Sequence, residues 1–422
     1  MTALPGLVLI LDGLGDRPSP RLHGKTPLEA AETPNLDFFA AQGLTGMVNH
    51  LAPWVPVGTH IGAGLLMGLR LEDAQKLQRG PVEAAGIGLD MAPGDVALRC
   101  NLAHVRLASD RFEILDRRAG RIEAHVPELC TVLNQIDLGT DYQVEFRPAT
   151  QHRVVCRLRG PQLSALITNT DPGAGQEELG ALTCQARRIK VKGAVQTAKL
   201  VNQLVSHAHR LLADHPVNTV RRRQGLPEAN GLLIRGAGKV QRLVNLLNLM
   251  KLKVALVSGE GTLLGLARLF GFETVVHPRF TASHTTDLAK KIEMALQATE
   301  RKDLVFLHIK ATDTLAHDLN PEGKRDFLER IDQALDPLRN FTGVIAISGD
   351  HTTDSNTGRH TGDPVPSLLW AENCRRDDSR EFGERQAFRG GLGQISAQSF
   401  LAAVLDHMGA LHNYQFHDRL FF

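Results

Sequence analysis

The sequence predicts an α/β fold in which a mostly parallel sheet is flanked by helices, with a smaller inserted α+β domain. Short apolar runs recur that end in acidic or small residues, and stretches with helical periodicity separate them. A middle region instead carries β-branched residues at much shorter intervals. Runs that are apolar on both faces and alternate with helices are typical of parallel sheets that helices cover.

Four apolar runs are predicted to be strands of the main sheet. They are LVLIL before Asp12, VALVSG at 254–259, LVFLHIKATD at 304–313 and GVIAISGD at 343–350. Ligands of such sheets gather beyond the carboxyl ends of the strands. Because Asp12, Asp313 and Asp350 all follow such runs, we expect their carboxylates to lie together.

The middle of the chain indicates a separate sheet. The segments DVALRCNLAHV, FEILD, YQVEFRP and HRVVCRLRG alternate or cluster β-branched residues at short intervals. We therefore place an inserted domain at 95–180 and the core domain at 1–94 and 181–422. The segment VQTAKLVNQLVSHAHRLLADHP has helical periodicity and is expected to return the chain to the core.

Composition limits the class of partner. The chain has 422 residues, enough for about two or three domains, and its net charge of +2 gives no bulk attraction to nucleic acid or to an anionic membrane. A small partner is therefore expected. Five scattered cysteines favour a reducing cytoplasm, and the LVLIL run is too short for a signal segment or a membrane span.

Two pairs of polar residues indicate metal binding. Asp313 and His317 are four residues apart, which on a helical turn places both side chains on one face; the alternative is an Asp cap beside an exposed His. Asp350 and His351 are adjacent at the end of a buried strand, where two polar side chains need a structural reason. A metal ion would supply that reason.

Carboxylate, imidazole and hydroxyl groups at this density suit two divalent ions that clamp a phosphoryl group in transfer. The predicted ligands are Asp12, Thr59, Asp313, His317, Asp350, His351 and His360. The chain is therefore interpreted as a phosphoryl-transfer enzyme.

Together with GKTPLEAAETPNLD and RGPVEAAGIGLDMAPGDVALRCN, these segments resemble the cofactor-independent phosphoglycerate mutases of the archaeal type. Those enzymes are members of the alkaline phosphatase superfamily. The resemblance reaches nearly the whole chain, through the order and spacing of all the motifs, and implies an alkaline phosphatase-like core that needs no 2,3-bisphosphoglycerate.

By this resemblance, each ion has its own set of ligands. Asp313, His317 and His360 would hold one ion, and Asp12, Asp350, His351 and Thr59 the other. Oxygen ligands mixed with imidazole favour Mn²⁺, with Zn²⁺, Co²⁺ and Mg²⁺ as alternatives.

Thr59 stands where the family carries its phosphorylated nucleophile, at the predicted start of a helix whose N–H groups would face the phosphoryl oxygens. A simple helix N-cap is the alternative interpretation. In the mutases the nucleophile is typically followed by Asp, Thr, Ala and His, whereas here it is followed by His60, Ile61, Gly62 and Ala63.

Anionic substrate groups need forked cationic partners, which Arg supplies best. The candidate substrate-binding residues, each of which could also be an ordinary surface group, are Asp116, Arg117, Arg121, His152, Arg153, Asn218, Arg222, Asn230 and Arg235. Asp171, in a turn-like segment, is a candidate for proton transfer.

The leading hypothesis is interconversion of 2-phosphoglycerate and 3-phosphoglycerate by a two-step route through phospho-Thr59. Retention of glycerate would distinguish a mutase from a phosphatase, because water reaching phospho-Thr59 gives hydrolysis. The altered segment after Thr59 leaves open a metal-dependent phosphohydrolase, or a phosphotransferase that acts on another small phosphorylated acid. A non-catalytic descendant that binds metabolites is the third possibility.

Overall fold

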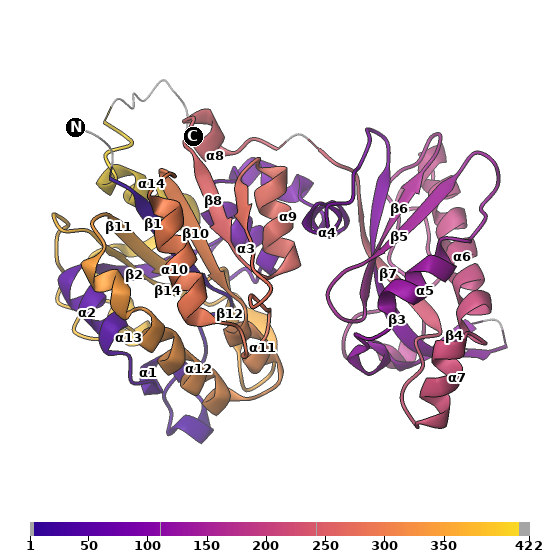
Figure 1. Ribbon diagram of the computed structural model, residues 1–422, viewed down its shortest axis with the longest axis horizontal. Helices are drawn as coiled ribbons and strands as arrows, with labels where there is room; N and C mark the ends of the chain where they lie inside the picture. Colours follow the sequence, from indigo (N-terminus) through magenta and orange to yellow (C-terminus); the bar gives the residue numbers. More distant parts are fainter. Residues whose placement is uncertain (1–3, 110, 242, 413–422) are drawn as a thin grey trace. The chain divides into compact units, whose positions relative to one another are not determined.

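The computed structural model describes residues 4–109, 111–241 and 243–412, which fold as two compact units (Figure 1). The first unit is Met1–Gln75 with Leu243–Phe422, and the second is Lys76–Arg242. Among the described residues no helix combines the length and apolarity that crossing a membrane requires.

An eight-stranded sheet forms the centre of the first unit. Its order is β15-β2-β14-β11-β1-β10-β8-β9, and β14 alone among these strands runs against the others. The strands are β1 (Gly6–Leu11), β2 (Leu44–Asn49), β8 (Val254–Val257), β9 (Glu273–Val275), β10 (Leu304–Ile309), β11 (Val344–Ser348), β14 (Val365–Trp370) and β15 (Gly393–Ser396). The mostly parallel sheet that the sequence predicted is confirmed.

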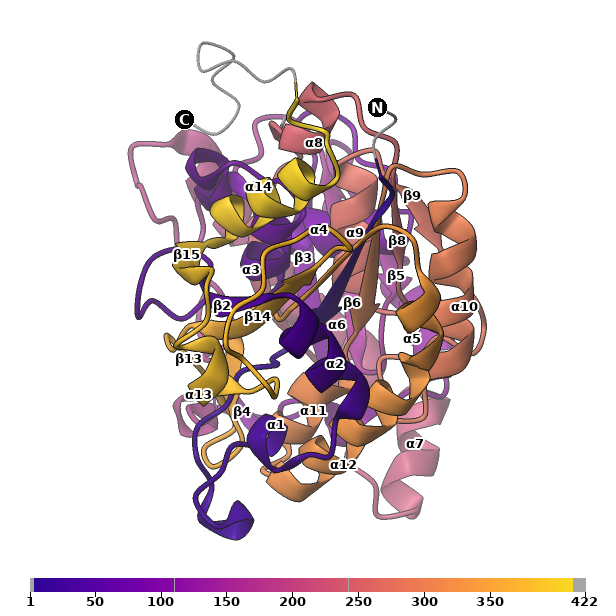
Figure 2. The ribbon, with the colours of Figure 1, turned by 90° about the vertical axis from the view of Figure 1, so that its left-hand side faces the viewer.

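The central strands are buried on both faces. Every residue of β1, β10 and β11 is buried, as their continuous apolar runs predict. Helices lie on both sides of this sheet (Figures 1 and 2), with α10 (Leu288–Thr299) and α12 (Pro321–Ala334) on one face and α3 (Thr59–Leu66) and α14 (Ala397–His407) on the other.

The second unit has a five-stranded antiparallel sheet of its own. The long strand β3 (Val96–Ala108) pairs with β4 (Arg111–Asp116), β6 (Arg153–Arg159) and β7 (Gly231–Gly238), and β5 (Gln143–Pro148) pairs with β6. A shared apolar core joins this sheet to α5 (Val126–Leu133), α6 (Lys192–Leu212) and α7 (Pro216–Arg223).

This second unit is larger than the predicted insert of 95–180. The helix that was expected to return the chain to the core, α6, buries Val201, Leu204 and Ala208 in the core of the second unit instead. Strand β7 then pairs with β3, so the chain rejoins the first unit only after this strand. Helical periodicity shows that a helix has an apolar face but not which sheet covers it.

Buried polar groups join the segment after β1 to the rest of the first unit. Lys324 Nζ, fully buried, lies 2.8 Å from Asp16 Oδ2 and donates to the Gly13 carbonyl at 2.7 Å. Glu384 accepts from the Asp16 backbone N–H at 3.2 Å and from Thr26 Oγ1 at 2.6 Å. Burial raises the pKa of Glu384 to about 7.

We expect Glu384→Gln to reduce the pH dependence of folding stability. The folded pKa of about 7 lies above the ordinary value of 4.5, so the folded wild type binds more protons between these values and loses stability as pH rises. Gln carries no charge at either pH. The unfolding free energy of the variant minus that of wild type should therefore rise by about 1–3 kcal/mol from pH 5 to pH 8.

Urea denaturation at the two pH values measures this gain. The prediction would be contradicted if variant and wild type differed in unfolding free energy by the same amount at pH 5 and at pH 8.

Candidate metal centre

Carboxylates gather at the carboxyl ends of the central strands. Asp12 follows β1 directly, Asp350 lies just beyond β11, and Asp313 lies in α11 (Ala311–His317), which follows β10. These three strands are neighbours and run parallel, so their ends meet at one edge of the sheet. The predicted meeting of these side chains is confirmed.

His351 lies between two groups of potential ligand atoms. Its Nε2 is 3.4 Å from Asp12 Oδ1 and 3.3 Å from Asp350 Oδ2. Its ring stacks on the ring of His360 with centroids 3.7 Å apart, and His360 Nε2 lies 3.5 Å from Asp313 Oδ1. His351 therefore belongs both with Asp12 and Asp350 and with Asp313 and His360, and the ligand atoms of each group lie within 4.8 Å of one another.

His317 lies beside the second group. Its Nε2 is 3.4 Å from Asp313 Oδ1 and 3.2 Å from His360 Nε2, as the four-residue spacing on α11 predicts. Its Nδ1 donates to the Gly358 carbonyl at 2.7 Å, which leaves the Nε2 lone pair for a ligand. The His351 imidazole lies within reach of both groups, and its assignment to one ion stays a prediction.

Thr59 is the first residue of α3, as predicted. Its side chain is buried, and its Oγ1 lies 3.2 Å from His351 Nε2. Gly58 takes the N-cap position, so the Thr59 hydroxyl is not used as the cap. The hydroxyl is therefore held at the edge of the ligand cluster, at the N-terminal end of a helix.

Gly62 allows α3 to approach the cluster. A Cβ at this position would lie 1.8 Å from the Asp350 carbonyl oxygen, which is backbone and cannot move aside easily. Glycine at this position therefore leaves room for α3 beside the Asp350 backbone.

Lys310, which the sequence analysis did not select, lies between two of the carboxylates. Its Nζ is 3.0 Å from Asp12 Oδ1 and 2.6 Å from Asp313 Oδ2. Burial opposes the ammonium form, but the two carboxylates outweigh burial and raise the pKa of Lys310. Burial alone would raise the pKa of Asp12 and of Asp313. Lys310 and the nearby histidines together outweigh burial, so the pKa of both carboxyl groups is lowered. The sequence did carry a signal for Lys310, because it directly follows a buried strand and precedes Asp313 by three residues.

Asp350 supplies the test of whether these residues fit divalent ions. Its Oδ1 accepts from the Gly13 N–H at 3.0 Å, but its buried Oδ2 makes no hydrogen bond to the described residues. Burial, followed by the charge of Asp12, raises the pKa of Asp350 well above its ordinary range. A buried carboxylate oxygen without a partner is costly unless a cation neutralises it. The residues fit such a cation.

The neighbouring imidazole is suited to the same task. Burial, followed by the nearby His360, holds the pKa of His351 well below its ordinary value. The ring is therefore neutral at physiological pH, which is the form that binds metal ions.

In the second unit, predicted substrate-binding residues form a buried cationic cluster. Arg117 donates two hydrogen bonds to Asp171, both of 2.7 Å, and Arg235 Nε lies 3.6 Å from the same carboxylate. Burial opposes ionisation of Asp171, but Arg117 lowers its pKa overall. Burial, together with Arg153 and other nearby arginines, lowers the pKa of His152 to about 3.

Further polar groups at this cluster were missed from the sequence. Arg99 is buried against Glu83 at 2.7 Å, and the guanidinium groups of Arg79, Arg153 and Arg235 act on it. Within the described residues, several buried polar atoms here have no hydrogen-bond partner: Arg79 Nε, Arg99 Nη1, Asn101 Oδ1 and His152 Nδ1. Clustered guanidinium groups with unused donors are typical of a site for an anion.

Four predicted substrate-binding residues make hydrogen bonds or an ion pair with neighbouring parts of the second unit. The Asn218 amide bonds to the backbone of Leu212 and Ala229, and the Asn230 amide bonds to Val105. Arg222 forms a surface pair with Glu228 at 2.8 Å. The carboxylate of Asp116 accepts from the backbone of the turn that follows it. These side chains are committed to local structure, and Arg121, in the same turn, is exposed.

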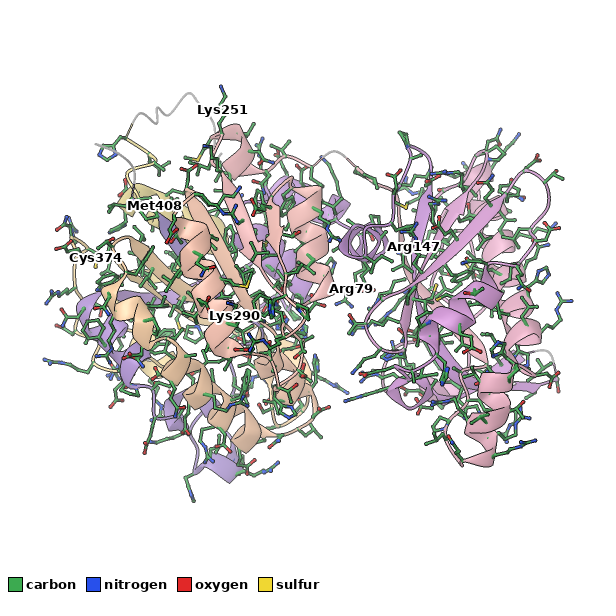
Figure 3. The ribbon with its side chains drawn as sticks, viewed as in Figure 1. Arg79, Arg147, Lys251, Lys290, Cys374 and Met408 are labelled. Atoms are coloured by element: carbon green, nitrogen blue, oxygen red, sulfur yellow. The ribbon has the colours of Figure 1, made fainter. Side chains whose placement is uncertain are left out.

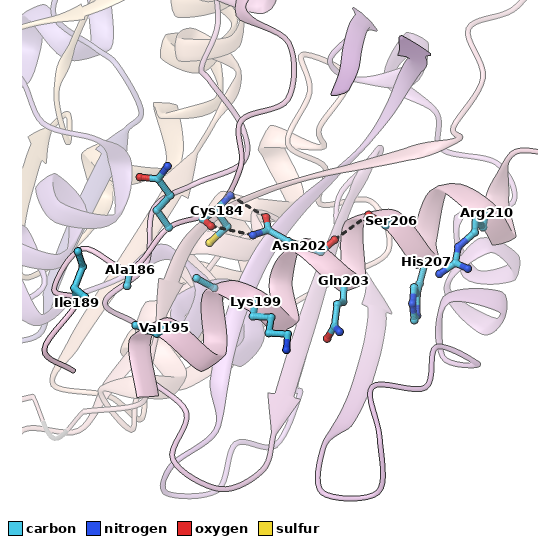
Figure 4. Close-up of a pocket in the computed structure, with 12 residues that line it drawn as sticks. Cys184, Ala186, Ile189, Val195, Lys199, Asn202, Gln203, Ser206, His207 and Arg210 are labelled. Carbon is cyan, nitrogen blue, oxygen red and sulfur yellow. Dashed lines mark hydrogen bonds between the residues drawn. The ribbon is translucent and has the colours of Figure 1, made fainter. Parts of the chain in front are cut away.

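A hollow of about 680 Å³ lies on α6 and the segment 184–189 (Figure 4). Ile189, Val195 and Ala198 give it apolar lining, and Lys199 and Arg210 lie along the same helix. None of the predicted site residues lines it, so it takes no part in the candidate centre.

The chain is similar to proteins of one family over nearly its whole length. The sequence model of the "2,3-bisphosphoglycerate-independent phosphoglycerate mutase" family matches residues 40–218. Proteins of that name from Archaeoglobus fulgidus and Methanopyrus kandleri are each 37% identical, over 96% and 95% of this chain and 98% and 95% of their own lengths.

Two solved structures are also similar to this chain over nearly its whole length. A protein of Pyrococcus horikoshii matches with a TM-score of 0.80 and 31% identity, covering 97% of this chain and 98% of its own. The cofactor-independent phosphoglycerate mutase of Thermoplasma acidophilum matches with a TM-score of 0.65 and 31% identity, covering 96% and 99%.

Gly62→Ala tests the close approach of α3 to Asp350. Ala in a helix interior is ordinarily favoured over Gly by about 1 kcal/mol. Here the added methyl group would displace α3 or Asp350, so we expect a lower unfolding temperature and at least tenfold weaker Mn²⁺ binding, in line with losses seen when groups around metal ligands are disturbed. Thermal unfolding and Mn²⁺ titration measure the two effects, and a variant more stable than wild type would contradict the assignment.

Proposed function

The chain belongs to the 2,3-bisphosphoglycerate-independent phosphoglycerate mutase family, and we propose that it interconverts 2-phosphoglycerate and 3-phosphoglycerate through a phosphorylated Thr59. One observation carries the proposal: the buried Thr59 hydroxyl lies 3.2 Å from His351 Nε2, at the edge of the Asp/His cluster and at the start of α3. Free cysteines and a small phosphorylated substrate support a reducing, cytoplasmic setting.

We assign the ligand cluster to two divalent ions. Asp12, Asp350, His351 and Thr59 would hold one ion, and Asp313, His317 and His360 the other. Mixed carboxylate and imidazole ligands favour Mn²⁺, with Zn²⁺, Co²⁺ or Mg²⁺ as alternatives. When bound, such ions neutralise the buried carboxylates and lower the pKa of a coordinated hydroxyl.

The reaction divides into two transfers at Thr59. In the first, the Thr59 Oγ–P bond forms as the substrate O–P bond breaks, the Thr59 proton is lost, and the released oxygen takes up a proton to give glycerate. In the second, the other hydroxyl of glycerate attacks the same phosphorus, loses its proton and regenerates Thr59. Backbone N–H groups at the start of α3 are suited to the phosphoryl oxygens.

The arginine cluster of the second unit is assigned to the anionic groups of the substrate. Arg99, Arg117, Arg153 and Arg235 repel one another when buried, and an anion would relieve that repulsion. Asp171 stays the candidate for proton transfer there, although Arg117 bonds to both of its oxygens and, with its pKa lowered, the carboxylate is a weak base. Retention of glycerate by such contacts is what a mutase needs and a phosphatase does not.

The second candidate is a metal-dependent phosphohydrolase, or a phosphotransferase that acts on another small phosphorylated acid. The observation that favours it is the segment after Thr59, where His60 and Ile61 replace the Asp and Thr typical of the mutases. The same ligand cluster would serve this reaction if water reached phospho-Thr59.

Phosphorus NMR of the Mn²⁺-loaded protein with 3-phosphoglycerate tests the proposal. We expect the 2-phosphoglycerate resonance to appear without inorganic phosphate, and Thr59→Ala to abolish this conversion because no acceptor oxygen remains. Thr59→Ser, which keeps the hydroxyl, is the matched control and should retain conversion. Phosphate alone would favour the hydrolase, and full conversion by Thr59→Ala would exclude the phosphothreonine route.

Arg153→Ala tests the role of the cationic cluster. Loss of a charge-assisted hydrogen bond to the substrate costs about 1.5–3 kcal/mol, so we expect KM for 3-phosphoglycerate to rise about tenfold or more. Arg222→Ala removes a guanidinium that is paired with Glu228 at the surface and should leave KM unchanged. Steady-state kinetics of both variants measure the difference, and equal KM values would argue against the cluster.

A further inference from the structure

His308 is a buried polar residue that the proposed reaction leaves unexplained. It interrupts the apolar run of β10, and its side chain is fully buried. A polar group buried in a central strand is costly unless its hydrogen bonds are made. Both ring nitrogens of His308 have a partner, and one of these partners is Asp12.

We propose that His308 is a positioning residue that fixes Asp12 so that one chosen carboxylate oxygen faces the metal centre, and that Ser258 sets the required tautomer of His308. The proposal rests on the metal-ligand role of Asp12 given under the proposed function. It assigns roles to two residues that do not themselves contact the reacting groups.

Strand pairing places His308 beside Asp12. His308 pairs in register with Ile10 of β1, and Asp12 lies two residues further along the chain. Since side chains alternate between the two faces of a sheet, those of Ile10 and Asp12 leave the same face as that of His308. His308 Nε2 lies 3.0 Å from Asp12 Oδ2, and both side chains are fully buried.

A chain of hydrogen bonds determines which nitrogen carries the proton. The Glu260 N–H donates to Ser258 Oγ at 3.0 Å, so the hydroxyl proton of Ser258 is free to point elsewhere. Ser258 Oγ lies 3.2 Å from His308 Nδ1 and can donate to it. Nδ1 then accepts, Nε2 carries the hydrogen, and that hydrogen points at the Asp12 carboxylate, which can only accept.

The bond to His308 separates the two oxygens of Asp12. Oδ2 is occupied by His308, whereas Oδ1 lies 3.4 Å from His351 Nε2 and 3.0 Å from Lys310 Nζ. Oδ1 is thus the oxygen on the side of the ligand cluster. Groups that orient a metal ligand in this way contribute strongly to metal affinity in proteins.

The backbone of His308 is also anchored. Lys291 Nζ donates to the His308 carbonyl at 2.9 Å, and Lys291 is almost completely buried. Lys291 belongs to α10, which packs on the face of β10 that carries Leu307 and Ile309, opposite to the His308 side chain. Both the ring and the main chain of His308 are therefore held in place before any ion binds.

Two substitutions separate positioning from packing. In His308→Gln the side-chain amide nitrogen takes the place of Nε2 and can still donate to Asp12, whereas in His308→Asn it takes the place of Nδ1 and cannot reach. Both remove the ring. We expect Asn to weaken Mn²⁺ binding by about tenfold to 100-fold and Gln by about threefold or less.

Mn²⁺ binding is measured by electron paramagnetic resonance of the free ion, with the full chain and no substrate. Equal weakening by both variants, or weakening by neither, would overturn the proposal. If the His308 variants do not fold, Ser258→Ala should weaken binding about fivefold, the equivalent of one hydrogen bond, and Ser258→Thr should not. Equal affinities of those two variants would also overturn it.

Asp12→Ala distinguishes this proposal from the proposed function. If it leaves Mn²⁺ binding unchanged, Asp12 is not a ligand and both proposals fail. If it removes binding while the His308 and Ser258 pairs show no difference, only the positioning role fails. Both results are measurements of Mn²⁺ binding, so neither depends on mutase activity.

Discussion

The burial of three carboxylates at one edge of the sheet is the constraint on which the rest of the structure depends. Asp12, Asp313 and Asp350 are each at most 2% exposed, and their charges repel across short distances. Lys310 contacts two of the three, whereas Asp350 Oδ2 makes no hydrogen bond to the described residues. Such an arrangement is costly for stability and is retained where a cation or a reaction requires it.

The surroundings of these carboxylates are correspondingly rigid. Gly62 lets α3 approach the Asp350 backbone, and Lys324 fixes the segment that follows Asp12 through carbonyl groups and Asp16. His308 Nε2 lies 3.0 Å from Asp12 Oδ2, the oxygen that faces away from His351 and Lys310. These buried contacts join segments far apart in the chain, so the fold holds the clustered side chains in place, which is how precise ligand geometry is usually secured.

In the second unit the charge that gathers inside the protein is positive. There, the buried Arg99 and Arg117 pair with the buried Glu83 and Asp171, and the half-buried Arg79, Arg153 and Arg235 add further positive charge. Among the described residues several donors remain unused. The first unit thus has an excess of buried negative charge at the carboxyl ends of its strands, and the second unit has an excess of buried and half-buried positive charge.

The sequence by itself determined the parallel sheet and the gathering of Asp12, Asp313 and Asp350 at one edge of it. Apolar runs that end in Asp12 and Asp350 can form only buried strands with polar ends, and parallel strands bring such ends together wherever the intervening chain goes. The spacing of Asp313 and His317 determined their shared face in the same way. These are properties of local pattern, which the chain carries without reference to distant neighbours.

Tertiary structure alone decided the rest. The sequence did not reveal that α6 and β7 belong to the second unit, because an apolar helix face does not specify the sheet that covers it. Nor did it reveal that the His351 imidazole lies within reach of both groups of side chains, that Lys310 lies between two carboxylates, or that, among the described residues, the side chains of Asn218 and Asn230 bond to backbone. Charge and hydrogen-bonding capacity can be read from a residue's type, but its partners depend on distances between segments far apart in the chain, and only folding sets those distances.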